Sequence, residues 1–215
     1  MHIEKEYKIF AGIALGAIIV GVLLFKFGNQ VPSAPILEPR ASAYSKGAPQ
    51  AKVVMTEFGD FQCPACYTAQ SAIEKLLGEY PSDLRLVFRN LPLTSHPYAL
   101  IAAQAAESAG AQGKFWEMHN TLYARQQEWG DPNKGTSEEQ ARAFFSAYAE
   151  GIGLDMNKYN ADMAGTTYQD VIRQDVEAGT KAGANATPTF YMNGVKVADP
   201  SYNSLKAAFE EAMKK

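Results

Sequence analysis

The spacing of apolar residues divides the chain into a first part with strands, a helical middle and a last part that returns to strands. Residues 53–58 form a short, mostly apolar and β-branched run typical of a buried strand, and residues 84–88 alternate like a second strand. Between these runs, apolar side chains recur at helical spacing, at Cys66, Ala69, Ile73, Leu76, Leu77 and Tyr80. This order predicts a βαβ unit with a right-handed crossover.

The middle of the chain, residues 96–182, shows helical patterns only. Ser137 and Gln140 have the spacing of a capping box at the start of one helix, and Asp155 is expected to cap another. Residues 129–132 predict a loop between helices. We interpret the apolar stripes of these helices as core rather than as a cofactor site.

The last part of the chain predicts a hairpin and a closing helix. Residues 189–192 and 195–197 flank Asn193-Gly194, the strongest short signal for a β-hairpin. Asp199 and Pro200 are expected to be the N-cap and the first residue of the final helix. The complete order is βαβ, a helical block and ββα, which predicts an α/β domain whose strands can belong to one sheet.

The beginning of the chain predicts a membrane anchor. Residues 9–25 carry no charged side chain, and at about 1.5 Å per residue they just span a hydrocarbon core of about 30 Å. We expect residues 9–27, within a segment 1–28, to form a single uncleaved transmembrane helix. A cleaved signal peptide is the alternative, but no small-x-small site closely follows the apolar run. Lys5 and Lys8 favour a cytoplasmic N-terminus in the inner membrane, with the remaining chain on the periplasmic side.

Composition separates a tether from a folded domain. Residues 29–50 are rich in Pro, Ala and Ser and lack periodicity, so we expect a flexible tether there. Residues 51–215 are enough for one domain with its own core. The formal net charge of −3 argues against a nucleic-acid partner.

Both cysteines of the chain lie in one tetrapeptide, Cys63-Pro64-Ala65-Cys66. Pro64 fits the first position of the predicted helix, so Cys63 lies at the helix N-terminus, where unpaired N–H groups and the helix dipole favour a thiolate. We therefore expect Cys63 to be acidic and nucleophilic. Cys66 lies one turn into the helix, where it is shielded and suits a resolving role. Two thiols this close can form and reopen a disulfide by exchange.

A metal site is the main alternative for these two cysteines. A structural zinc site needs four ligands, and the further candidates are His2, His96 and His119. We interpret His96 and His119 as structural. A copper(I) carrier that uses the two thiolates alone stays open, because soft sulfur ligands select that ion.

Three blocks of sequence together resemble the DsbA-like thioredoxin-fold disulfide oxidoreductases. They are Gly59-Asp60-Phe61-Gln62-Cys63-Pro64-Ala65-Cys66, Lys114-Phe115-Trp116-Glu117-Met118-His119, and Thr187-Pro188-Thr189-Phe190 followed by Asn193-Gly194. The resemblance covers the chain from about residue 47 onward. It implies a thioredoxin-like domain, residues 51–95 and 183–215, interrupted by a helical insertion at residues 96–182.

The resemblance also assigns roles to individual residues. It implies that Thr187-Pro188 is a cis peptide beside the cysteines, where the backbone of Thr187 can pair with an extended substrate peptide; a trans proline opening an edge strand is the alternative. It further implies that Glu57 lies beneath the site and exchanges a proton with Cys66. From the residues alone, Glu57 either faces solvent or is buried behind the helix, where burial would raise its pKa.

We therefore expect an enzyme without a cofactor, a thiol:disulfide oxidoreductase that donates the Cys63–Cys66 disulfide to reduced or unfolded secreted proteins. Ala65 stands where the strongest oxidants of the family carry histidine, so we expect a milder oxidant, by about 30 mV. Net oxidation requires a membrane partner, which the resemblance implies is a quinone-coupled oxidase. A membrane reductase would instead make the protein an isomerase or reductase. We expect the soluble domain to be a monomer.

Overall fold

The computed structural model describes residues 44–131 and 134–215. The predicted anchor, residues 9–27, and the tether up to residue 43 lie outside the described residues. Within the described residues, no helix is both long and apolar enough to cross a bilayer.

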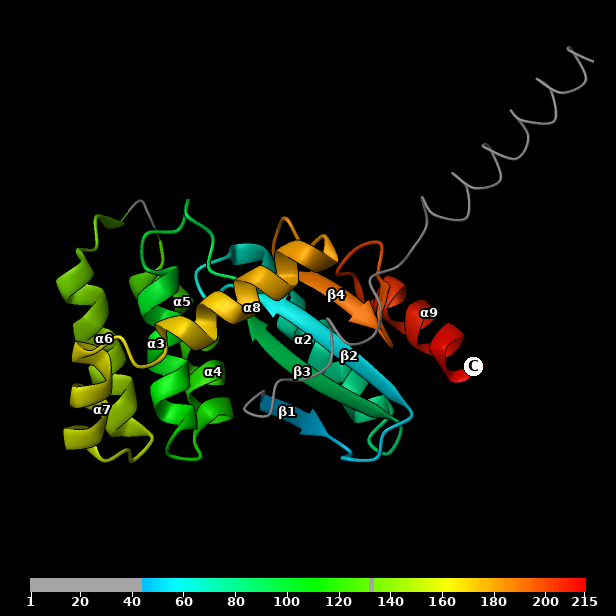
Figure 1. Ribbon diagram of the computed structural model, residues 1–215, viewed down its shortest axis with the longest axis horizontal. Helices are drawn as coiled ribbons and strands as arrows, with labels where there is room; N and C mark the ends of the chain where they lie inside the picture. Colours follow the sequence, from blue (N-terminus) through cyan, green and yellow to red (C-terminus); the bar gives the residue numbers. More distant parts are fainter. Residues whose placement is uncertain (1–43, 132–133) are drawn as a thin grey trace, which may run out of the picture. The chain divides into compact units, whose positions relative to one another are not determined.

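A five-stranded sheet of order β1-β3-β2-β4-β5 forms the centre of the fold (Figure 1). Its strands are β1 (Tyr44–Gly47), β2 (Val53–Gly59), β3 (Leu84–Asn90), β4 (Thr189–Met192) and β5 (Val195–Lys196). Strands β2 and β3 are parallel, and every other neighbouring pair is antiparallel. The parallel pair is joined by helix α2, which confirms the predicted βαβ unit.

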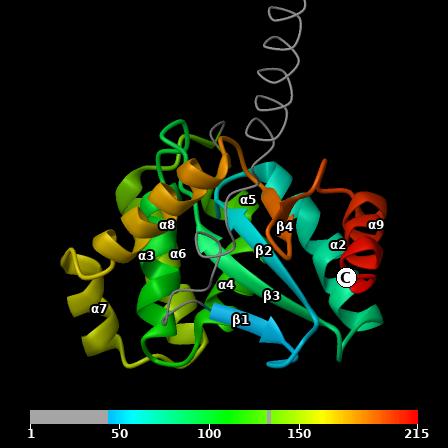
Figure 2. The same ribbon diagram turned by 45° about the vertical axis from the view of Figure 1, so that its right-hand side comes forward.

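Helices cover both faces of this sheet and one of its sides. The helices are α2 (Pro64–Glu79), α3 (Ala99–Gly110), α4 (Phe115–Ala124), α5 (Gln126–Trp129), α6 (Glu138–Gly151), α7 (Met156–Ala164), α8 (Gln169–Ala182) and α9 (Tyr202–Met213). Helices α2 and α9 lie on one face of the sheet, α8 crosses the other, and α3 to α7 gather at one side (Figures 1 and 2). The order βαβ, helices, ββα is as predicted.

The side chains of β2 alternate between the two faces of the sheet, so successive residues contact different helices. Val53 and Met55 belong to the apolar core shared with α2 and α9, whereas Phe58 packs with residues of α8 and β4. Because side chains of a strand alternate between faces, Glu57 shares the α2 face with Met55. The strand thus directs a carboxylate toward the helix that begins at the cysteines.

Strand β1 corrects the prediction that residues 29–50 form a tether, because Tyr44–Gly47 pairs with β3. The ring of Tyr44 stacks on Phe115 with centroids 3.8 Å apart, and the indole N–H of Trp116 donates to the carbonyl of Ser45 at 3.1 Å. Gly47 has a φ of 103°, and a Cβ there would lie 2.4 Å from the carbonyl oxygen of Leu84. The four residues carry no strand pattern of their own, so tertiary contacts decide their conformation.

Two helix boundaries also differ from the prediction. Helix α9 begins at Tyr202 with Ser201 as its N-cap, because the Asp199 carboxylate instead accepts the backbone N–H of Ser201 at 2.9 Å. Trp129, expected in a loop, ends helix α5, where its buried ring contacts Phe145 with centroids 4.8 Å apart. The predicted capping box at Ser137 and the predicted cap at Asp155 are confirmed.

Candidate active site

Cys63 occupies the N-cap position of α2, and Pro64 follows as the first helical residue. The backbone N–H groups of Ala65 and Cys66, at the start of the helix, interact with the Cys63 sulfur. Cys63 is 7% exposed, whereas Cys66 is 0% exposed. Of the two cysteines, Cys63 is therefore the more exposed.

The two thiols have opposite acidities. A hydrogen bond from the Cys66 side chain, assisted by Thr187 and by the backbone N–H groups of Cys66 and Ala65, lowers the pKa of Cys63 to about 5, although burial opposes the shift. Burial raises the pKa of Cys66 well above its usual value, and the neighbouring Cys63 and Glu57 act in the same direction. At neutral pH the reduced pair is a thiolate at Cys63 and a thiol at Cys66.

Glu57 lies buried behind α2, which rules out the solvent-facing alternative. Its side chain is 0% exposed, and burial raises the pKa of its carboxyl to about 8. One carboxyl oxygen accepts a hydrogen bond from the Gln70 side chain at 3.5 Å, and the other, Oε2, has no partner in the described part of the chain. A carboxyl with this pKa can take up or release a proton near neutral pH.

The Thr187–Pro188 peptide is cis, as the resemblance implied. The sulfur of Cys63 lies 3.4 Å from the carbonyl oxygen of Thr187, to which it can donate only in its thiol form. The structure thus brings Cys63, Cys66, Glu57 and Thr187 together, although their roles in a reaction stay predictions.

Polar side chains that the sequence analysis did not single out hold the loop before the cysteines. The buried carboxylate of Asp60 accepts the backbone N–H of Gln62 at 2.7 Å, the backbone N–H of Leu93 at 2.9 Å and contacts Nδ1 of His96 at 2.7 Å. The Gln126 amide donates to the carbonyl oxygen of Cys63 at 3.0 Å. These long-range bonds fix the start of α2. Only the polarity of Asp60 within an apolar segment signals this role in the sequence.

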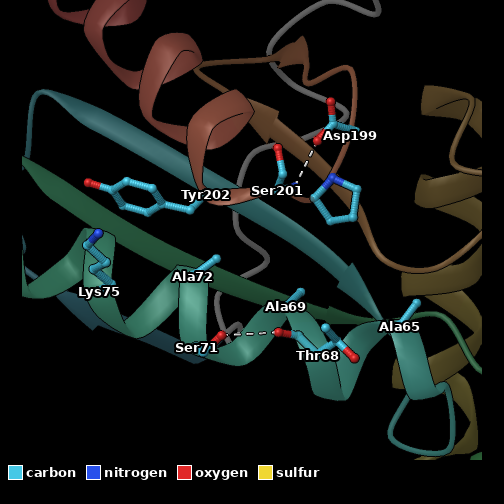
Figure 3. Close-up of a pocket in the computed structure, with 10 residues that line it drawn as sticks. Ala65, Thr68, Ala69, Ser71, Ala72, Lys75, Asp199, Ser201 and Tyr202 are labelled. Atoms are coloured by element: carbon cyan, nitrogen blue, oxygen red, sulfur yellow. Dashed lines mark hydrogen bonds between the residues drawn. The ribbon is translucent and has the colours of Figure 1, made fainter.

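A groove of about 700 Å³ begins beside the cysteines and runs along α2. Its α2 side includes Ala65, Ala69 and Ala72, and the loop before α9 forms the opposite side (Figure 3). At the far end from Ala65, Lys75 lies over the ring of Tyr202, 3.8 Å from its centroid (Figure 3). The three small side chains form an apolar wall of the groove, and Ala65 at its end lies between the two cysteines in the sequence.

The two described histidines have structural surroundings. His96 bonds to Asp60 as above, and burial lowers the pKa of His119 to about 4, so that its ring is neutral among aromatic side chains. In residues 44–131 and 134–215, no group of three or more His, Cys, Asp or Glu side chains could hold a metal ion. A metal at the cysteines would have only the two sulfur ligands from these residues.

Comparison with known proteins gives one family model, described as thioredoxin, that matches residues 42–211. The chain is 40% identical over 170 residues to the Na⁺/H⁺ antiporter NhaA 3 of Salinispora tropica. It is 30% identical over 184 residues to the antiporter NhaA of Herminiimonas arsenicoxydans. These matches cover 78% and 84% of this chain but only 24% and 28% of the antiporters. The chain thus spans about a quarter of the length of these curated relatives.

Solved structures with the same fold are oxidoreductases and related proteins. A thioredoxin-like oxidoreductase from Silicibacter pomeroyi has a TM-score of 0.69 and 26% identity, over 86% of this chain and 98% of its own. Oxidised BdbD from Bacillus subtilis has a TM-score of 0.69 and 23% identity, over 81% and 94% of the two chains. The α-DsbA1 protein of Wolbachia pipientis has a TM-score of 0.68 and 19% identity, over 85% and 98%.

Proposed function

The chain belongs to the thioredoxin family, with DsbA-like thiol:disulfide oxidoreductases among its structural neighbours, and from this we propose that it donates its Cys63–Cys66 disulfide to other proteins. The observation that carries the proposal is the difference in acidity between the two sulfurs. The Cys63 pKa falls to about 5, whereas that of Cys66 rises. Stabilising the Cys63 thiolate stabilises the reduced enzyme, which makes its disulfide easier to give away.

The reaction begins with the oxidised pair. A substrate thiolate attacks the sulfur of Cys63, the Cys63–Cys66 bond breaks, and a mixed disulfide forms between substrate and Cys63. Cys66 leaves with the electron pair and receives a proton from the Glu57 carboxyl. A second substrate thiolate then attacks the substrate sulfur and releases Cys63 as a thiolate. The substrate loses two electrons to become a disulfide, and the enzyme pair gains them.

The groove beside Ala65 supports a peptide substrate. Its apolar floor can take a side chain that flanks the substrate cysteine, while the backbone at Thr187 can pair with the extended peptide. Because Thr187 adjoins the Cys63 sulfur, such pairing would hold the substrate sulfur near the point of attack. A partly unfolded protein offers an extended segment of this kind.

We place the reaction next to a membrane, on its outer side, where disulfides persist. The apolar run at residues 9–25 supports this location. A membrane oxidant, by class a quinone-coupled oxidase, would then remove the two electrons from the reduced pair.

The test begins with the acidity of Cys63. In the reduced protein, thiolate absorbance should rise with a midpoint near pH 5, and Cys63→Ser should abolish that step. A thiol that titrates at the ordinary value of about 8.5 contradicts the proposal. The oxidised protein should also transfer its disulfide, one for one, to a reduced model protein.

The direction of electron flow is tested separately in intact cells. Trapping the thiols by alkylation should find the pair oxidised for a disulfide donor. A pair trapped in the reduced state would indicate an isomerase or reductase instead. Stoichiometric copper(I) on the purified protein, without disulfide transfer, would indicate a metal carrier.

A further inference from the structure

Glu57 is enclosed, yet in the proposed function it gives a proton to Cys66 and has to be protonated again before the next cycle. Its side chain is 0% exposed, and its Oε2 atom has no partner in the described part of the chain. A buried carboxyl that gives its proton to Cys66 becomes a buried anion, which is costly until it is protonated again. A route between Glu57 and solvent would restore the proton before Cys66 returns one.

The Gln70 side chain contacts both Glu57 and the backbone of Cys66. Its amide nitrogen lies 3.5 Å from Oε1 of Glu57 and 3.3 Å from the carbonyl oxygen of Cys66. Gln70 is itself half-buried, so its amide joins the enclosed carboxyl to the surface of α2.

A second pocket opens on the outer side of Gln70. This α2–α4 pocket has a volume of about 360 Å³ and is lined by Tyr67, Gln70, Glu74, Asn120, Tyr123 and Ala124. Its volume can hold several water molecules, at about 30 Å³ each. Gln70 lines the pocket and also contacts the Glu57 carboxyl, which does not line it.

The α2–α4 pocket and the substrate groove lie on opposite sides of α2. At about 100° of rotation per residue, Gln70 and Glu74 face away from Ala65 and Ala72, which line the groove. A peptide in the groove would leave the other side of the helix open to water.

We propose that Gln70 controls the exchange of a proton between Glu57 and water in the α2–α4 pocket. In the reductive half of the cycle Cys66 leaves the disulfide and takes the Glu57 proton, and the carboxylate recovers a proton from water in this pocket. When the disulfide forms again, Glu57 returns a proton to this water and accepts the one that Cys66 gives up. Gln70 is a positioning residue, because it acts through Glu57 and does not contact the substrate. The expected effect on the reaction rate rests on the proposed function, whereas the expected effect on the protonation of Glu57 does not.

The ionisable groups around the carboxyl come from three elements. Cys63 and Cys66 lie on α2, Asp60 precedes that helix, and Tyr123 on α4 is buried near all of them. Glu74, at the edge of the pocket, pairs with Lys46 at 2.8 Å. Replacing Gln70 by an uncharged residue alters none of these charges, so a change in the titration of Glu57 would report access to water and the lost amide.

Two substitutions at Gln70 separate access to water from loss of the amide. Gln70→Leu removes the amide and fills its place with an apolar side chain, whereas Gln70→Ala removes it and opens the space above Glu57. The Glu57 pKa, followed by carboxyl carbon NMR in the oxidised protein, should rise in Gln70→Leu and fall in Gln70→Ala. Under single turnover, Gln70→Leu should slow the reduction of the enzyme disulfide by a reduced peptide about tenfold, and Gln70→Ala should stay within about twofold of wild type.

The controls identify the cause. In a Glu57→Gln background, neither Gln70 substitution should change the rate further. Gln112→Leu removes an amide that bonds to Asp155 in the helical block, and it should leave both readouts unchanged. Equal shifts of the Glu57 pKa in Gln70→Leu and Gln70→Ala, or no shift in either, would overturn the inference. A wild-type protein that oxidises no peptide would overturn the proposed function, while the NMR titration would still test Gln70.

Discussion

At the scale of single residues, the site depends on two sulfurs of one tetrapeptide that have different surroundings. Cys63 has backbone N–H groups and the Cys66 thiol around its sulfur, whereas Cys66 has apolar surroundings and a buried carboxyl nearby. The first environment favours a charged sulfur and the second a neutral one. The difference arises within one turn of helix, because one residue lies at the helix end and the other inside it.

The burial of Glu57 should make stability depend on pH. The carboxyl has a folded-state pKa of about 8, above its ordinary value of 4.5, so its favourable contribution is complete below pH 4.5 and is lost as the pH rises through 8. Glu57→Gln should therefore stabilise the oxidised protein above pH 8, by on the order of 4 kcal/mol relative to its effect at pH 4. Urea unfolding at both pH values measures this difference. An effect of equal size at pH 4 and pH 9 would contradict the burial of an ionisable carboxyl.

Residue patterns predicted the positions of the two cysteines better than the contacts that hold them in place. Cys63 and Cys66 follow from their spacing and from Pro64, because a helix end acts on a sulfur through local geometry. The sequence did not point to Asp60 or Gln70, because their partners lie in other elements. Asp60 bonds to the backbone of Leu93, and Gln70 bonds to Glu57 on the strand behind its helix. No local sequence pattern distinguishes a polar side chain that bonds to a buried group from one that faces solvent.

At the scale of elements, helix α2 separates two environments. One side carries the groove with Ala65, Ala69 and Ala72, and the other carries Gln70 and Glu74. Its inner face packs Ile73 and Leu76 against the sheet. A single helix thereby begins at Cys63, lines the groove and supplies part of the apolar core.

Filling the groove should impair the reaction with peptides and spare the reaction with small thiols. Ala72→Trp should reduce the rate of disulfide transfer to a reduced peptide about tenfold, or by ~1.4 kcal/mol, because the bulky ring occupies the space of a flanking side chain. Glutathione needs only the Cys63 sulfur, so its rate should not change. Stopped-flow measurements with both reductants compare the two rates.

Ala143→Trp is the matched control, since Ala143 is an exposed alanine within helix α6. It should leave both rates unchanged. If Ala72→Trp slowed peptide and glutathione alike, the groove would not be the peptide site.

Element boundaries followed from the sequence where a local bond decides them. Asn193 and Gly194 adopt φ values of 45° and 83°, as a two-residue hairpin turn requires, and Ser137 forms its capping box. Ser201 and Asp199 are both good caps, and the sequence does not show which one bonds to the helix and which to the turn. Strand β1 depends on Phe115 and Trp116, which are remote in the chain.

At the scale of the whole molecule, a buried ion pair joins the sheet to the helical block. Arg89 of β3 and Asp175 of α8 lie 2.8 Å apart, and their side chains are 5% and 0% exposed. The Asp175 carboxylate also accepts the backbone N–H of Asn90 at 3.0 Å. This pair links two parts of the chain that the βαβ unit alone does not connect.

Removing one partner of this pair should destabilise the entire fold. Asp175→Ala leaves the Arg89 charge buried without its carboxylate and should cost about 3–5 kcal/mol of unfolding free energy, measured by urea denaturation. Asp170→Ala removes an exposed carboxylate of the same helix, 3.0 Å from Arg173, and should cost less than about 1 kcal/mol. Similar small losses in both variants would show that the buried pair does not join the two parts.

The order of strands in the sheet has a consequence for behaviour in crowded solution. The two seven-residue strands, β2 and β3, lie inside the described sheet, while its outer strands β1 and β5 have four and two residues, each with a lysine. Outer strands that are short and charged offer few unpaired backbone groups to a strand of another protein. Under the proposed function the protein meets unfolded chains, which are rich in unpaired backbone, and these outer strands limit the pairing of such chains with its sheet.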